Sequence, residues 1–147
     1  AVVDLQCEGD CAAASGFASG VFREPLSGQD YVLPVAMDTR MMVIGARSAI
    51  AGLTGLMDAD GEGLGADRVV NLPNNAYAVT DMIAALERVA AENGITFGPV
   101  TPKPDPAIEA IIKSWPLAME DSRARALGLP ADESLEAIIR EYIADWL

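Results

Sequence analysis

The sequence has 147 residues, of which 51% are hydrophobic, and carries a net charge of −12. A chain of this size and composition can bury one hydrophobic core. The acidic balance argues against nucleic acids and anionic membrane surfaces as partners, because both require basic patches. No apolar run approaches the roughly 20 residues that span a bilayer, and no basic-then-apolar signal segment is present, so we expect a cytoplasmic protein.

The N-terminal residues AVVDL, at 1–5, have the composition of a buried strand. Cys7 and Cys11 follow in the segment CEGDC. The sequence contains no histidine and no third cysteine, whereas a structural metal site typically has four such ligands. We therefore expect no metal site and two free thiols, with a local disulfide as the alternative.

The stretch AAASGFASGVFREPLSG, at 12–28, is predicted to be a loop that enters a short helix ending near Pro25. Its small residues allow close approach of the backbone to a ligand. Ser15 and Ser19 offer hydroxyls, and Arg23 offers a forked cation that suits a carboxylate or phosphate. An ordinary loop with a solvated charge pair between Arg23 and Glu24 is the alternative interpretation.

The middle of the chain predicts two short strands, at 31–35 and 40–44, followed by a helix. That helix carries Ile50, Leu53 and Leu56 on one face. The acidic and glycine-rich residues 58–67 predict a flexible polar connection, and RVVNL at 68–72 predicts a strand.

The C-terminal part is predicted to be largely helical. The segment 79–94 has a helical apolar stripe made of Met82, Ile83, Leu86, Val89 and Ala90, with Gly94 at the expected C-terminal cap. A short extended piece at 95–100 leads to a helix that starts at Pro106, and Asp121 is expected to cap a short helix that Gly128 stops. The last helix, from about Ser134, presents a predicted buried face: Leu135, Ile138, Ile139, Tyr142, Ile143 and Trp146.

Four blocks of the sequence resemble, in order, the extended short-chain dehydrogenase/reductase family, also called the NAD-dependent epimerase/dehydratase family. The first block is ASGFAS followed by REPLSG, and the second is the strand and helix from Arg40 to Ala49. The third is the unit that contains Asn71 and the segment VTDMI. The fourth, near the end of the chain, contains SRA, LG and SLEAIIREY. The resemblance covers 12–147 and only the C-terminal half of such an enzyme. It implies an α/β fold: the end of a Rossmann-like sheet plus a small mixed α/β substrate-binding domain. Residues 1–147 would form this substrate-binding portion, with the cofactor-binding half absent.

The resemblance is strongest to the branch of the family that oxidises sugar acids such as D-erythronate with NAD. In relatives that bind nucleotide sugars, the arginine at the position of Arg40 contacts the substrate's phosphate. Met41 and Met42 replace the usual polar-aromatic pair here, which favours a smaller anion such as a carboxylate. The resemblance implies a substrate wall made of Ser15, Ser19, Arg23 and Arg40, although Arg40 also fits a surface cation at a strand end. Asn71 is expected to cap its turn, with substrate contact as the alternative.

Hydride transfer in this family requires a glycine-rich pyrophosphate turn and a Tyr-x-x-x-Lys pair. None of the three tyrosines has a lysine four positions later. The residue at that spacing is Val35 for Tyr31, Asp81 for Tyr77 and Trp146 for Tyr142. We therefore expect no catalytic residue in this chain and no tight binding of NAD to it. Its expected partners are a sugar acid and either a second copy or the missing cofactor half. The alternatives are a stand-alone, non-catalytic binding module and part of a nucleotide-sugar epimerase or dehydratase.

Overall fold

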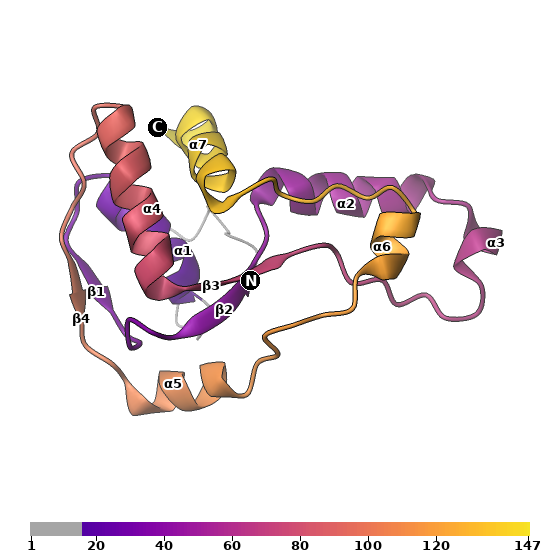
Figure 1. Cartoon of the computed structure of the whole chain (residues 1–147), viewed down its shortest axis with the longest axis horizontal. Helices are drawn as coiled ribbons and strands as arrows, with labels where there is room; N and C mark the ends of the chain where they lie inside the picture. The colour runs from indigo at the N-terminus through magenta and orange to yellow at the C-terminus, as the bar shows by residue number, and fades with distance from the viewer. Residues whose placement is uncertain (1–15) are drawn as a thin grey trace.

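The computed structural model describes residues 16–147, apart from the side chains of residues 62 and 63. The strand predicted over 1–5, both cysteines and Ser15 lie outside these residues. The described part is mixed α/β, as predicted (Figure 1). Its elements are α1 (Gly16–Leu26), β1 (Tyr31–Leu33), β2 (Arg40–Val43), α2 (Ala46–Asp58), α3 (Gly61–Leu64), β3 (Asn75–Ala78), α4 (Val79–Glu92), β4 (Val100–Pro102), α5 (Pro106–Lys113), α6 (Ser122–Ala126) and α7 (Leu135–Trp146).

Helices α1, α4 and α7 gather around the main hydrophobic core with the strands beside them (Figure 1). The apolar stripe predicted on α4 is confirmed, because all five of its residues are buried. Helix α7 buries the predicted face as far as Tyr142, whereas Ile143 is half-buried and Trp146 is 49% exposed. Each large side chain that is fully buried contributes about 1.5–3 kcal/mol, so the α4 stripe is a major source of stability.

The helix ends follow local sequence signals. The Asp105 carboxylate accepts a hydrogen bond from the Ala107 amide at 2.8 Å, and Pro106 occupies the first helical position of α5, as predicted. The Ser134 hydroxyl accepts from the Ala137 amide at 3.1 Å and caps α7. Gly94 follows α4 with a φ of +69°, which is the left-handed conformation expected after a helix.

The strands form two separate pairs. Strand β1 runs parallel to β4, and β2 runs antiparallel to β3 in a register that places Arg40 opposite Ala78. The strands predicted at 31–35 and 40–44 are confirmed with slightly shorter bounds. The extended piece predicted over 95–100 leads into β4, which begins at Val100, and the Gly98 amide before it donates to the Pro25 carbonyl of α1 at 2.8 Å.

The strand predicted over 68–72 is wrong, and the next strand is β3. The guanidinium of Arg123 donates to backbone carbonyls in this segment and just before it. It bonds the carbonyl of Leu64, that of Asp67 at 2.5 Å and that of Val69 at 3.1 Å. These carbonyls are satisfied by a side chain from α6 rather than by a neighbouring strand.

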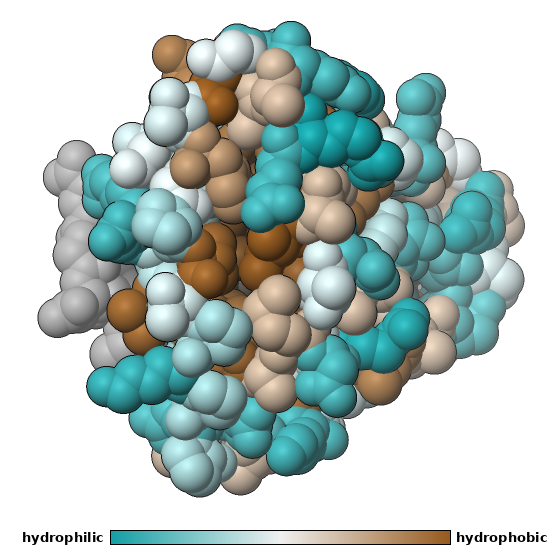
Figure 2. All heavy atoms as spheres, turned by 60° about the vertical axis from the view of Figure 1, so that its left-hand side comes forward, coloured by the Kyte–Doolittle hydropathy of each residue, from teal (hydrophilic) through white to brown (hydrophobic). Residues whose placement is uncertain are grey.

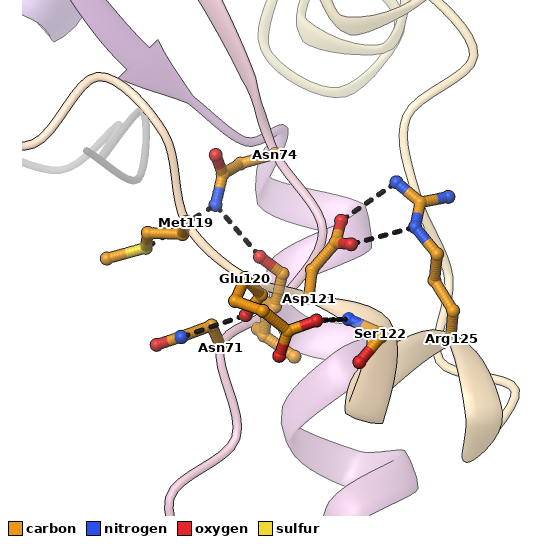
Figure 3. A network of polar contacts seen from close by, with 8 residues as sticks. Asn71, Asn74, Met119, Glu120, Asp121, Ser122 and Arg125 are labelled. Atoms are coloured by element: carbon orange, nitrogen blue, oxygen red, sulfur yellow. Dashed lines mark hydrogen bonds and ion pairs between the residues drawn. The ribbon is translucent and has the colours of Figure 1, made fainter.

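Two further predictions need correction near α6. The connection predicted over 58–67 contains the one-turn helix α3. Asp121 does not cap α6 with its side chain; its carboxylate accepts from Arg125 at 2.9 and 2.8 Å (Figure 3). The Ser122 amide is instead satisfied by the Glu120 carboxylate at 2.8 Å, and the Asn71 amide group donates to the Glu120 carbonyl at 3.0 Å (Figure 3).

We predict that Arg123→Gln loosens the segment that follows α3. The variant loses the forked donor that holds three backbone carbonyls, so local opening becomes more frequent. Limited proteolysis with trypsin should cleave after Arg68 several times faster in this variant. Arg125→Gln is the matched control, since Arg125 pairs only locally with Asp121 among the contacts described here. Equal cleavage rates after Arg68 in the two variants would contradict this role of Arg123.

Candidate functional site

A groove of about 500 Å³ opens between the turn that joins β1 to β2 and the helix α5. The turn supplies one side of the groove, while α5 and the residues after it supply the other. Its base is apolar, because Ile112 is buried there. The lining residues are Ala36, Asp38, Thr39, Arg40, Glu109, Ile112, Lys113, Trp115 and Leu117.

The turn is held in place by the start of α4. The Thr39 carbonyl accepts from the Val79 amide at 2.9 Å. The Met37 carbonyl accepts from both the amide and the hydroxyl of Thr80, at 2.9 and 2.8 Å. The turn therefore presents its side chains to the groove from a fixed backbone.

Charged groups of both signs line the groove. Arg40 is exposed at the start of β2, and its guanidinium donates to the Ala76 carbonyl at 3.2 Å. One oxygen of the Glu109 carboxylate accepts from the Ala36 amide at 3.1 Å, and the other lies 3.4 Å from the ammonium of Lys113. Two cations, Arg40 and Lys113, and two carboxylates, Asp38 and Glu109, thus line the same groove.

The predicted site residues do not all lie at this groove. Arg40 lines it, whereas Ser19 and Arg23 lie on α1, where Ser19 is 8% exposed. The guanidinium of Arg23 contacts one carboxylate oxygen of Glu24 through two nitrogens, at 2.9 and 2.6 Å. The charge pair considered from the sequence is therefore present, but it is partly buried rather than fully solvated. Binding roles for Ser15, Ser19 and Arg23 stay predictions.

Tyr31 lies across α1 beside that charge pair. Its hydroxyl donates to the Phe17 carbonyl at 3.2 Å, and its ring lies so close to Gly20 that a Cβ there would be 2.7 Å from it. Burial raises the pKa of Tyr31 to about 12; the Glu24 carboxylate adds to the increase, and Arg23 opposes it. At neutral pH the Tyr31 phenol is therefore a neutral hydrogen-bond donor.

Sequence reasoning missed the α5 side of the groove. The sequence places Glu109, Lys113 and Trp115 in the helix that starts at Pro106 and at its end, and predicts no ligand contact for them. The spacing of Glu109 and Lys113 does predict an ion pair on one helix face. Nothing in the sequence indicated that Glu109 contacts Ala36, which is 73 residues away. Asn71, considered for a turn cap or a substrate contact, instead donates to the Glu120 carbonyl.

The described residues contain no group of three His, Cys, Asp or Glu side chains placed to hold a metal ion. None of the helices within 16–147 is both long enough and apolar enough to cross a membrane.

Comparison with solved structures shows which class of enzyme has this fold. No family model matches the chain. The described fold matches a solved nucleoside-diphosphate-sugar epimerase from Agrobacterium tumefaciens with a TM-score of 0.84 and 35% identity, over 98% of this chain and 41% of that one. It also matches an L-threonine dehydrogenase from Cupriavidus necator with a TM-score of 0.74, at 22% identity. The fold is that of the epimerase and dehydrogenase enzymes that the sequence resembles, in their C-terminal portion.

Within this class, the chain is similar to D-erythronate dehydrogenases. It is 43% identical over 134 residues to the one from Cupriavidus necator and 29% identical over 131 residues to the one from Haemophilus influenzae. These matches cover 91% and 89% of this chain. The chain spans 41% of the length of each of these relatives. The resemblance stated from the sequence is therefore confirmed.

We predict that the phenol of Tyr31 titrates near pH 12 in the folded protein, against about 10 for an unperturbed tyrosine. The folded pKa is the higher one, so this stabilising contribution is complete below about pH 10 and is lost as pH rises through 12. Burial also raises the pKa of Tyr77 and that of Tyr142, so the late component of phenolate absorbance should shrink by one tyrosine in Tyr31→Phe. Denaturant unfolding should show a smaller loss of stability between these pH values in Tyr31→Phe. A late component of unchanged amplitude in that variant would contradict the assignment.

Proposed function

We propose that this chain is the substrate-binding portion of an NAD-dependent oxidoreductase that acts on a sugar acid resembling D-erythronate. The observation that carries the proposal is the groove at Arg40, in a chain 43% identical to a D-erythronate dehydrogenase. The relatives are more than twice as long as the matched region, so the hydride step and tight NAD binding belong in this proposal to a cofactor-binding portion.

The groove has the chemistry that a polyhydroxy acid requires. A guanidinium such as that of Arg40 binds a carboxylate through two parallel hydrogen bonds. The Asp38 carboxylate accepts hydrogen bonds from substrate hydroxyls, and the Thr39 hydroxyl can donate or accept. Binding roles for Ser15, Ser19 and Arg23 are proposed separately from this groove, since Ser19 and Arg23 lie on α1 and do not line it.

A nucleotide-sugar substrate is the second candidate, because the Agrobacterium structure bears the name of a nucleoside-diphosphate-sugar epimerase. The resemblance disfavours it, because Met41 and Met42 replace the polar-aromatic pair of relatives that bind nucleotide sugars. A stand-alone binding module is the third candidate. It would bind the same acid without any cofactor-binding portion.

We predict that the chain binds D-erythronate and that Arg40→Gln weakens this binding by about tenfold or more, since a lost hydrogen bond to a charged group costs about 1.5–3 kcal/mol. Isothermal titration and amide chemical-shift mapping measure the affinity and the location. Erythritol lacks the carboxylate and should bind weakly to both proteins. Arg140→Gln is the matched control, because Arg140 pairs with Glu92 at 3.0 Å and does not line the groove. Tighter binding of a uridine diphosphate sugar than of D-erythronate would favour the second candidate.

An exposed apolar surface supports the proposal that this chain pairs with a cofactor-binding portion or with a second copy. Helix α2 packs on its own chain through small residues: a Cβ at Gly52 would lie 2.7 Å from the Leu72 side chain. The face predicted from the sequence is largely uncovered, with Ile50 63% and Leu53 60% exposed; Met57 beside it is 83% exposed. Figure 1 shows that α2 extends away from the core helices. On another face, hydrophobic residues are exposed at the centre of the surface and are surrounded by hydrophilic residues (Figure 2).

We predict that the isolated chain self-associates through the α2 face, because exposed apolar patches favour association. Light scattering should give a mass above 15.4 kDa that Leu53→Glu shifts toward the monomer. Ala51→Glu is the matched control, since Ala51 is exposed on the same helix but off this face. A monomeric profile for the unaltered chain would contradict the prediction.

A further inference from the structure

We propose that Lys113 and Trp115 form the second wall of the substrate groove. In this proposal Lys113 binds the carboxylate together with Arg40, and Trp115 packs against the carbon chain of the acid. The inference rests on the proposed function, since it concerns the same groove and the same substrate class. Neither residue was expected to contact a ligand from the sequence.

The position of Lys113 is set by Glu109. The two residues are four apart on α5, and the ammonium lies 3.4 Å from one oxygen of the Glu109 carboxylate. The other oxygen of that carboxylate accepts from the Ala36 amide at 3.1 Å. Glu109 is therefore a positioning residue that connects the lysine to the turn that precedes Arg40.

The ammonium of Lys113 is accessible to a ligand. Its side chain is 76% exposed, whereas that of Glu109 is 20% exposed. An ammonium carries three donors, and Glu109 takes one of them at a long distance. The remaining donors can bind an anion in the groove, and the Arg40 guanidinium is available to the same anion from β2.

Trp115 gives this wall its apolar part. The Trp115 amide donates to the Ile112 carbonyl at 3.0 Å, which fixes the backbone as the chain leaves α5. The residue is half-buried, and it lines the groove with the buried Ile112 and the exposed Leu117. A polyhydroxy acid exposes C–H groups along its carbon chain, and an indole ring buries such groups while the hydroxyls bond elsewhere.

The lysine half of the proposal has a matched control in the chain, because Lys103 is the only other lysine in the sequence. Brief acetylation of the whole chain, read by mass spectrometry, reports each lysine separately. Saturating D-erythronate should slow acetylation of Lys113 several-fold and leave Lys103 unchanged. In titrations, Lys113→Gln should raise the dissociation constant about tenfold, Lys113→Arg should largely restore binding, and Lys103→Gln should match the unaltered chain.

The tryptophan half uses the other tryptophan, Trp146, as its control. In Trp146→Phe the remaining indole is Trp115, and D-erythronate should change its fluorescence. In Trp115→Phe the remaining indole lies in the last turn of α7, outside the groove lining, and the ligand should leave its fluorescence unchanged.

The outcomes separate this inference from the proposed function. If the unaltered chain does not bind D-erythronate, both are overturned. If it binds and Arg40→Gln weakens binding, while Lys113 is acetylated at the same rate with and without ligand, the proposed function stands and the role of Lys113 is wrong. A fluorescence change that persists in Trp115→Phe overturns the role of Trp115.

Discussion

The groove depends on one requirement: the N–H groups at the start of α4 must find hydrogen-bond acceptors outside the helix. The N–H groups at the start of a helix have no partner within the helix, and burying them unbonded is costly. Ala78, at the N-cap of α4, supplies no side-chain cap. The amides of Val79 and Thr80 are instead satisfied by the carbonyls of Thr39 and Met37. The hydrogen bonds that cap α4 therefore also hold in place the turn that lines the groove.

This arrangement couples the core to the site. Strand β3 leads directly into α4, and β2 follows directly from the turn, so the antiparallel register of β2 and β3 places Arg40 opposite Ala78. The apolar stripe of α4, with Leu86 and Val89 fully buried, fixes the helix in the core. The backbone position of Arg40 is therefore determined by buried side chains and backbone hydrogen bonds. The Arg40 side chain itself remains exposed.

The sequence predicts the parts of this structure that depend on local patterns. The stripe of α4, the Pro106 start of α5 and the strand at Arg40 follow from periodicity and capping rules. The failures arise from contacts between distant residues. A strand at 68–72 is reasonable until Arg123 bonds its neighbouring carbonyls, and the α5 side of the groove depends on Glu109 contacting Ala36 across 73 residues. Arg40 was predicted as a site residue because the resemblance marked its position, whereas Lys113 and Trp115 had no comparable signal.

The balance of charge in the groove bears on the kind of anion it would hold. The diphosphate of a nucleotide sugar carries two negative charges and no hydrogen-bond donor of its own, so only the hydroxyls of its sugars could donate to Asp38. A sugar acid carries one negative charge and several hydroxyls, which can donate to Asp38 while its carboxylate faces Arg40. Glu109 is already occupied by the Ala36 amide and Lys113, so it requires no donor from the ligand. Under the proposed function, the cations would therefore hold the carboxylate of the acid, and Asp38 would accept hydrogen bonds from its hydroxyls.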